Sequence, residues 1–231
     1  MNLQNFKINE CPSSAYYIPD FITPEEESII LSMVAKAPKP RWTQLSNRRL
    51  INYGGVPHPK GMIVEEIPAW LQKHVDKVNQ LTKVFEDGRK ANHVLVNEYL
   101  PGQGIMPHVD GPLFYPTITT ISCGSHTVLE FQEPHDRENS HPEKLLRIIK
   151  LWIEPRSLLI LKDDMYHQYL HSISEITEDE IDQDFANLSV LKRGSSIVQM
   201  EDKQIRGTRI SLTIRHKCLN DKYHVEKFKS Q

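Results

Sequence analysis

The sequence predicts a mainly β fold with buttressing helices (α+β), with a double-stranded β-helix, or jelly roll, as its core. Two observations lead to this prediction. Two segments with helical spacing of apolar residues come early in the 231-residue chain, and from about residue 92 the apolar period changes to two. Helices followed by a run of short strands are typical of a sandwich in which the helices pack on one sheet.

The first helix is expected to begin at Pro24. Thr23 as N-cap, Pro24 at the first helical position and Glu26 two residues later form a capping box. An apolar face then follows at helical spacing, made of Ile29, Ile30, Met33, Val34 and Ala37.

The second helix is expected within "IPAWLQKHVDKVNQLTKVFEDG". Pro68 stands at its start, apolar residues recur near helical spacing as far as Phe85, and Gly88 follows its end. Residues 1–90 are therefore predicted to be an N-terminal helical extension packed on the core.

Six strands are expected after this extension, with turn signals between them. They are "HVLVNEYL", "TITTIS", "TVLEF", "RIIKLWI", "SLLIL" and "RISLTIR". The core domain predicted from them spans residues 91–218, and residues 219–231 form a C-terminal tail.

Composition excludes several classes of protein. The net charge is −2, the hydrophobic fraction is 39%, and the three cysteines form no CxxC pair, which argues against a cysteine-based zinc module and suits a reducing compartment. The N-terminus lacks an apolar leader, and no stretch approaches membrane-spanning length. We expect a soluble protein of the cytoplasm and nucleus, with no membrane partner.

Two segments differ from this background. Residues 36–60 contain six lysines and arginines, no acidic residue, and the aromatic side chains Trp42 and Tyr53. Residues 175–184 contain six acidic residues and begin a polar stretch that reaches about Gly207. Because this stretch is long for a loop, we expect it to be mobile.

A candidate metal site begins at "MPHVDGP". On an extended segment His108 and Asp110 project to the same side, and an imidazole with a carboxylate suits iron, manganese or zinc. A later histidine would complete the two-His-one-carboxylate set of non-haem Fe(II) oxygenases. His167 and His171, which follow the apolar "SLLIL", are both candidates.

The segment "RISLTIR" carries two arginines six residues apart. On a strand Arg209 and Arg215 would face the same way, with Ser211 and Thr213 between them, while the intervening isoleucines and leucine would face the core. Two inward guanidinium groups are costly without anions, and a dicarboxylate would satisfy both. Asn97 and Tyr99 share a strand face upstream and could donate hydrogen bonds to carboxylate oxygens.

Taken in order, these elements resemble the signature of the AlkB-type Fe(II)/2-oxoglutarate dioxygenases. The elements are Asn97-x-Tyr99, His108-x-Asp110, a histidine in "LHSI", and Arg209-x5-Arg215. The resemblance covers about residues 91–218 by motif. "APKPRWTQLSNRRL", "NHVLVNEYLPGQGIMPHVDGP" and "GSHTVLEF" further resemble one animal branch of the family, which extends it into the N-terminal half.

The resemblance implies an Fe(II)- and 2-oxoglutarate-dependent enzyme that uses O2. His108, Asp110 and His171 would hold the iron, His171 being preferred over His167 because a small and an apolar residue follow it. Arg209 would bind the distal carboxylate of 2-oxoglutarate with help from Tyr99. Arg215 and Asn97 would act nearer the metal. No catalytic residue beyond the metal site is implied, and Ser211 stands where many relatives have asparagine.

For the substrate, the resemblance favours oxidative demethylation of an N-alkylated nucleic acid, DNA or RNA. Residues 36–60 would then form a nucleotide-recognition lid, with cations on phosphates and an aromatic ring on an extruded base. The candidate substrate-binding residues are Arg48, Arg49, Tyr53, Phe114 and Tyr115. Two alternatives remain open: a hydroxylase or demethylase of a protein, and a nucleic-acid-binding protein with little activity.

Overall fold

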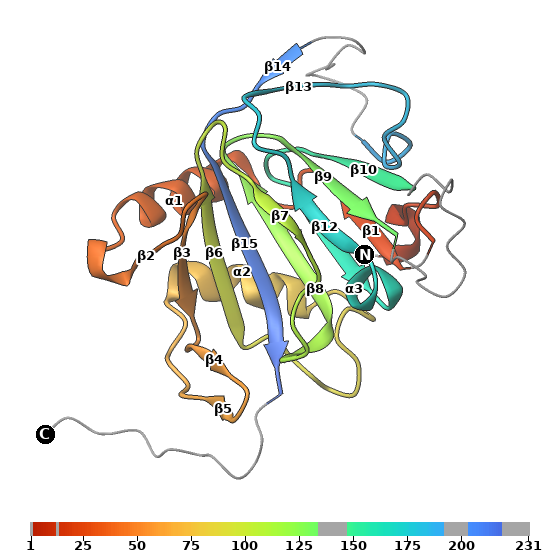
Figure 1. The fold of residues 1–231 in the computed structure, drawn as a ribbon. Helices are drawn as coiled ribbons and strands as arrows, with labels where there is room; N and C mark the ends of the chain where they lie inside the picture. The colour runs from red at the N-terminus through yellow and green to blue at the C-terminus, as the bar shows by residue number, and fades with distance from the viewer. Residues whose placement is uncertain (1, 13, 134–146, 192–202, 219–231) are drawn as a thin grey trace, which may run out of the picture.

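Two antiparallel sheets face each other in the computed structural model, which describes residues 2–12, 14–133, 147–191 and 203–218 (Figure 1). The large sheet has the strand order β1-β11-β8-β15-β6-β3-β2, and the small sheet has the order β10-β9-β12-β7. Two two-stranded sheets, β4-β5 and β13-β14, lie outside these sheets. The mainly β jelly-roll core predicted from the sequence is confirmed.

The strands of the large sheet are β1 (Ala15–Ile18), β2 (Thr43–Gln44), β3 (Arg49–Tyr53), β6 (His93–Tyr99), β8 (Phe114–Cys123), β11 (Leu158–Lys162) and β15 (Arg209–Lys217). The strands of the small sheet are β7 (Ile105–His108), β9 (Thr127–Gln132), β10 (Ile148–Ile153) and β12 (Leu170–Ile173). The strands of the two-stranded sheets are β4 (Pro57–His58), β5 (Gly61–Met62), β13 (Glu178–Glu180) and β14 (Lys203–Ile205). The helices are α1 (Pro24–Ala35), α2 (Ala69–Asn79) and α3 (Asp164–His167), with short 3-10 turns at Leu3–Phe6 and Lys39–Arg41.

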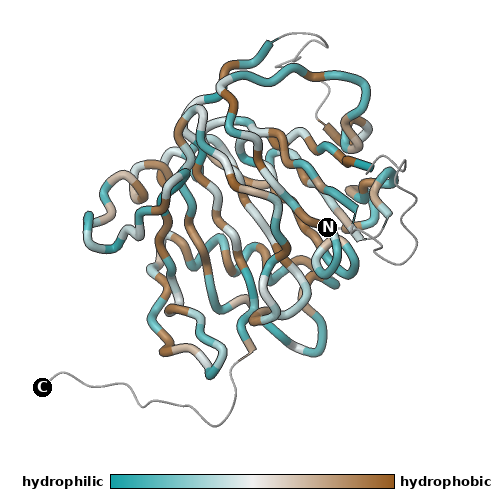
Figure 2. The backbone as a smooth tube through the Cα atoms, in the orientation of Figure 1, coloured by the Kyte–Doolittle hydropathy of each residue, from teal (hydrophilic) through white to brown (hydrophobic). Residues whose placement is uncertain are grey.

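Side chains of alternate residues on the central strands point to opposite faces of the large sheet. Ile210, Leu212 and Ile214 of β15 are buried in one core cluster with residues of α1 and α2, so both helices pack on the outer face of this sheet. Apolar and polar segments alternate along these strands in Figure 2. The residues between them on β15 therefore face the small sheet.

Residues 1–90 contribute strands as well as helices. β1 pairs with β11 at one end of the large sheet, and β3 pairs with β6 near the other end. The extension and the domain expected from the sequence thus share one sheet. The tail at residues 219–231 lies outside the described residues.

The first helix confirms its predicted cap but not its whole predicted face. The Thr23 hydroxyl accepts from the Glu26 amide, and the Glu26 carboxylate accepts from the Thr23 amide. Ile30 and Val34 are buried, whereas Ile29 is 44% exposed. Met33 is also exposed, so only part of the predicted apolar face is buried. Only a narrow stripe of α1 meets the sheet.

The second helix is shorter than predicted. α2 ends at Asn79, and Lys83 adopts a left-handed backbone with φ of +67°, which a continuing α-helix cannot contain. Val84 is nevertheless fully buried and Phe85 packs against the same core. The apolar pattern continued beyond the helix because irregular chain after α2 also covers the core.

The acidic stretch is partly ordered, contrary to the expectation of a mobile loop. Asp179 accepts two hydrogen bonds from the Arg206 guanidinium, at 2.5 and 2.7 Å, and both side chains are buried. Ile181 and Phe185 are buried beside Trp152. Residues 192–202 lie outside the described part of the chain. Among the described residues, no helix is long and apolar enough to cross a membrane.

Candidate active site

Two histidines face each other across the small sheet. His108 on β7 and His171 on β12 are register partners, and their ring centroids are 4.2 Å apart. β7 can approach β12 because Gly104 lacks a side chain: a Cβ atom there would lie 2.2 Å from the Ile173 carbonyl oxygen. The strand pairing therefore brings together two residues that lie 63 positions apart in the sequence.

Asp110 joins the two histidines from the loop after β7. One ligand atom from each of His108, Asp110 and His171 lies within 4.8 Å of the others. The Nδ1–H of His108 donates to the Met106 carbonyl at 2.8 Å, which leaves Nε2 free to bind a metal. His167 is exposed at the end of α3 and does not belong to this cluster.

The loop that carries Asp110 is held by Tyr166. The Tyr166 hydroxyl donates to the Gly111 carbonyl at 3.0 Å, and its side chain is buried. Sequence reasoning missed Tyr166, since the four-residue helix α3 that positions it gives too short a pattern to detect.

Burial sets the protonation state of His171. It lowers the pKa of His171 to about 4; Asp110 opposes the shift and His108 adds to it. The imidazole is therefore neutral near pH 7, the form in which histidine binds metals.

β15 presents a polar row to the space between the sheets. Arg209, Ser211, Thr213 and Arg215 all line one cavity, as the spacing in "RISLTIR" predicts. Arg215 lies at the metal end, with Nη1 4.0 Å from Asp110 Oδ1. Burial lowers the pKa of both guanidinium groups, and Asp110 opposes this shift for Arg215, so keeping the two groups charged inside the cavity carries a cost.

Arg209 lies at the other end of the row. Its Nη2 donates to Ser122 Oγ at 2.9 Å, and its guanidinium carbon is 5.6 Å from the Tyr99 ring centroid. Sequence reasoning missed Ser122, although the alternation in "TITTIS" would have placed it with Thr120 on the face that turned out to line the cavity.

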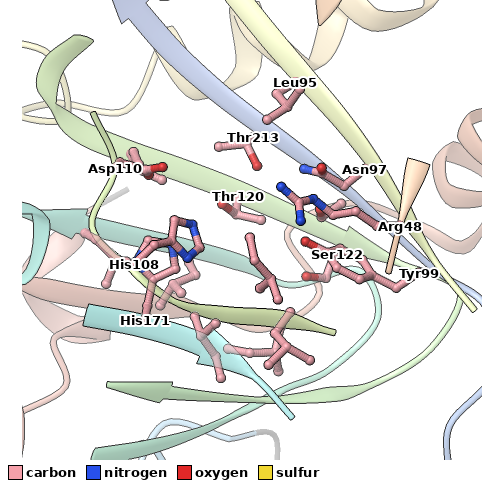
Figure 3. A pocket seen from close by; sticks show the side chains of 18 of the residues that line it. Arg48, Leu95, Asn97, Tyr99, His108, Asp110, Thr120, Ser122, His171 and Thr213 are labelled. Carbon is pink, nitrogen blue, oxygen red and sulfur yellow. The ribbon is translucent and has the colours of Figure 1, made fainter. Parts of the chain in front are cut away.

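The cavity between the sheets has a volume of about 280 Å³. That is near the lower end of the range for small-molecule sites, roughly 300–1,000 Å³. Figure 3 shows His108, His171 and Asp110 at one side, and Asn97, Tyr99, Ser122 and Arg48 at the other. The charged lining consists of three arginines and one carboxylate, besides the two histidines.

The candidate substrate-binding residues are dispersed. Arg48 lines the cavity, whereas the other four are not among its described lining residues. Arg49 makes a two-pronged ion pair with Glu98, and the Tyr53 ring packs edge-on against Trp70. The Arg215 guanidinium carbon lies 3.8 Å from the Phe114 ring centroid, and the Arg89 guanidinium carbon lies 4.9 Å from the Tyr115 ring centroid. Trp42 packs against the core under Arg49.

The cavity suits a divalent metal together with a dianionic ligand. Two imidazoles and one carboxylate form a donor set that leaves coordination positions open. Buried polar atoms without a hydrogen-bond partner line the remaining space, namely Asn97 Oδ1, Arg209 Nε, Arg215 Nε and Arg48 Nε. Such orphaned groups are costly unless a ligand or water satisfies them. Fe(II) and 2-oxoglutarate fit these residues in charge and donor type.

Comparison with known proteins agrees with this geometry. The family model of the 2OG-Fe(II) oxygenase superfamily matches residues 14–215. The chain is 48% identical over 219 residues to "Probable RNA/DNA demethylase ALKBH6" of Danio rerio, covering 94% of this chain and 91% of the relative. It is 33% identical over 171 residues to "Uncharacterized protein L905" of Acanthamoeba polyphaga mimivirus, covering 71% and 74% of the two chains.

The fold also matches a solved structure, that of OsALKBH1, with a TM-score of 0.54 at 14% sequence identity, covering 87% of this chain and 97% of that one. The match to the zebrafish relative confirms that the resemblance reaches the N-terminal half. The chain belongs to the 2OG-Fe(II) oxygenase superfamily and is a dioxygenase that uses Fe(II), 2-oxoglutarate and O2.

Proposed function

We propose that this dioxygenase demethylates N-alkylated nucleic acid, RNA or DNA. The observation that carries the proposal is the 48% identity, over 94% of the chain, to a relative named as a probable RNA/DNA demethylase. Histidine, aspartate and arginine side chains in one cavity supply the matching chemistry.

In this proposal His108, Asp110 and His171 hold Fe(II). Arg209 and Tyr99 bind the distal carboxylate of 2-oxoglutarate, Arg215 acts near the metal end, and Asn97 and Ser211 complete the polar lining. When bound, the metal and cosubstrate supply O2-dependent hydroxylation of a C–H bond, with one oxygen atom going to succinate and CO2 released. The apolar residues that line the cavity beside the two histidines, Ile105, Val109, Leu129 and Ile173, limit water around the reacting carbon.

Formaldehyde is the expected product of the methyl group that is removed. Hydroxylation of an N-methyl group gives an N–CH2–OH group, whose C–N bond breaks to release formaldehyde while the nitrogen takes up the hydroxyl proton. The balance is one O2 and one 2-oxoglutarate consumed per formaldehyde, succinate and CO2 formed. The chain's part is to hold the methyl group beside the metal ligands.

Contacts with nucleic acid are proposed for the lysines of residues 36–60. Arg41 is 3.4 Å from Glu65, and Arg49 is paired with Glu98, so both arginines already have carboxylate partners. Lys39 and Lys60 are exposed and would contact phosphates. We also propose that the protein acts in the cytoplasm and nucleus, where methylated nucleic acids occur.

The test is mass spectrometry of nucleosides from total RNA and DNA incubated with Fe(II), 2-oxoglutarate and the purified protein, with His108→Ala as control. The proposal expects a loss of one N-methylated nucleoside with the wild type only. If the same preparation removes methyl groups from, or adds oxygen to, protein digests while every nucleoside is unchanged, a protein is the substrate.

A further inference from the structure

A third arginine, besides Arg209 and Arg215 of β15, lines the cavity. Arg48 precedes β3, lines the cavity with Asn97, Tyr99 and Arg209, and has a buried Nε without a hydrogen-bond partner. In Figure 3 its guanidinium points toward Asn97, on the side away from His108.

The neighbouring residue explains why Arg48 turns inward. Arg49 Nε and Nη2 donate to the Glu98 carboxylate at 2.6 and 2.8 Å, and the Arg49 guanidinium lies 4.1 Å from the Trp42 ring centroid. Glu98 lies between Asn97 and Tyr99 on β6, so it faces away from the cavity that they line. Adjacent residues of extended chain point to opposite sides, and with Arg49 fixed outward, Arg48 is directed to the cavity.

Hydrogen bonds also hold the chain before β3 in place. The Leu45 amide donates to the Arg48 carbonyl at 2.9 Å, and the Gln44 side chain donates to the same oxygen at 3.3 Å. The Asn47 amide side chain donates to the Glu175 carboxylate, which links this turn to the acidic segment. The backbone of Arg48 is therefore fixed by the hydrogen bonds of this turn.

The charges that line the cavity indicate which kind of ligand Arg48 would bind. Asp110 is the single carboxylate among the described lining residues, and it belongs to the metal cluster beside Arg215. Within the described chain neither Arg48 nor Arg209 has an ion pair with a carboxylate. Burial raises the pKa of Tyr99, and both Arg209 and Arg48 oppose that rise, so the two guanidinium groups act on the same phenol. The end of the cavity away from the metal thus carries two cations and no anion.

We propose that Arg48 binds the distal carboxylate of 2-oxoglutarate together with Arg209, closing the cosubstrate cavity from the β2–β3 side. Two guanidinium groups on one carboxylate favour a cosubstrate that carries this distal carboxylate, since each adds charge-assisted hydrogen bonds only when that carboxylate is present. The inference depends on the cosubstrate of the superfamily and not on which macromolecule is demethylated.

The test measures binding of two probes to the Mn(II)-loaded protein by calorimetry, with no substrate present. 2-Oxoglutarate carries both ends of the cosubstrate, and oxalate carries only a metal-chelating end. Arg48→Met keeps the length of the side chain and removes its charge, while Arg48→Lys keeps the charge. Arg41→Met, from the same segment but outside the cavity lining, is the matched control.

Arg48→Met is expected to raise the Kd for 2-oxoglutarate about tenfold or more, the size of one lost charge-assisted hydrogen bond, and to leave the Kd for oxalate unchanged. Arg48→Lys should recover part of the loss, and Arg41→Met should bind both probes as the wild type does. Unchanged 2-oxoglutarate binding in Arg48→Met would overturn the proposal, and weaker binding of an oligonucleotide by the same variant, measured separately, would make Arg48 a substrate contact instead. Equal losses for both probes would overturn it as well. Either result would leave the demethylase proposal standing, because that proposal is tested by nucleoside analysis.

Discussion

His108 and His171 are cross-strand partners on β7 and β12, with ring centroids 4.2 Å apart. This pairing makes a metal site out of two short strands, and Asp110 completes it from the adjoining loop. The other parts of the site are arranged around it, with Arg215 near Asp110 and Arg209 at the opposite end of the cavity.

The metal site predicts unequal effects for two nearby histidines. His171→Ala should weaken Fe(II) binding by more than the roughly 10–100-fold that loss of an outer hydrogen-bond partner of a metal ligand costs. His167→Ala should bind Fe(II) as the wild type does, since His167 is exposed and outside the cluster. Anaerobic calorimetry measures both. The reverse order of loss would place the third ligand at His167.

Close approach of β7 and β12 predicts that Gly104→Ala is destabilising. The added Cβ would lie 2.2 Å from the Ile173 carbonyl oxygen, so the strands must separate, at a cost of about 1–3 kcal/mol for such overpacking. Urea unfolding should show this loss, together with weaker Fe(II) binding. Gly111→Ala is the control for stability, because its Cβ would meet nothing within 4 Å. Equal stability of the two variants would show that β7 has room to move.

Two-pronged recognition predicts that Arg209→Lys raises the KM for 2-oxoglutarate. Lysine keeps the charge but loses the planar fork, and losing a charged hydrogen bond of about 1.5–3 kcal/mol corresponds to roughly a 10- to 150-fold rise. Succinate formation over a range of 2-oxoglutarate concentrations measures it. An unchanged KM would remove Arg209 from the cosubstrate site.

A buried histidine outside the site predicts a pH dependence of stability. His74 on α2 is fully buried, neither ring nitrogen has a hydrogen-bond partner, and burial lowers its pKa to about 4. The unfolded chain, with a histidine pKa of about 6.5, binds more protons between these values, so stability falls as the pH drops through that window. His74→Leu should therefore lose less stability between pH 7 and pH 5 than the wild type in urea unfolding. Parallel pH profiles for the two proteins would contradict this.

Nucleic-acid binding through the basic segment predicts a moderate salt dependence. Two or three phosphate contacts give a log–log slope of affinity against salt of about −1.5 to −2 on a single strand. Lys39→Glu with Lys60→Glu should flatten the slope without changing 2-oxoglutarate turnover in the absence of substrate. Fluorescence anisotropy with a short oligonucleotide measures the slope, and salt-independent binding would argue for a protein substrate.

Sequence alone predicted the parts of the site that follow from local periodicity. The alternation in "RISLTIR" placed Arg209 and Arg215 on the cavity face, because a strand has a fixed period of two. The choice of His171 needed the family resemblance, since both candidate histidines follow the same buried strand. The structure brings only His171 into the cluster.

Features that depend on distant partners were not predictable from local patterns. Arg48 and Arg49 are chemically alike in the sequence, and it is Glu98, 49 residues beyond Arg49, that sends one outward and leaves the other in the cavity. Likewise, Asp179 looked like part of a solvated acidic run, and its order comes from Arg206, 27 residues later. Tertiary pairing decided both cases.

The most direct test of the account is the stoichiometry of products on a methylated substrate. Pooled N-methylated RNA and DNA oligonucleotides are incubated with the wild type, Fe(II) and 2-oxoglutarate, and formaldehyde and succinate are measured together, with His171→Ala as control. The account predicts formaldehyde in a near-equal amount to the substrate-dependent succinate, and neither product from the variant. Succinate formation that no oligonucleotide stimulates, with no formaldehyde above the variant's level, would contradict nucleic-acid demethylation by this site.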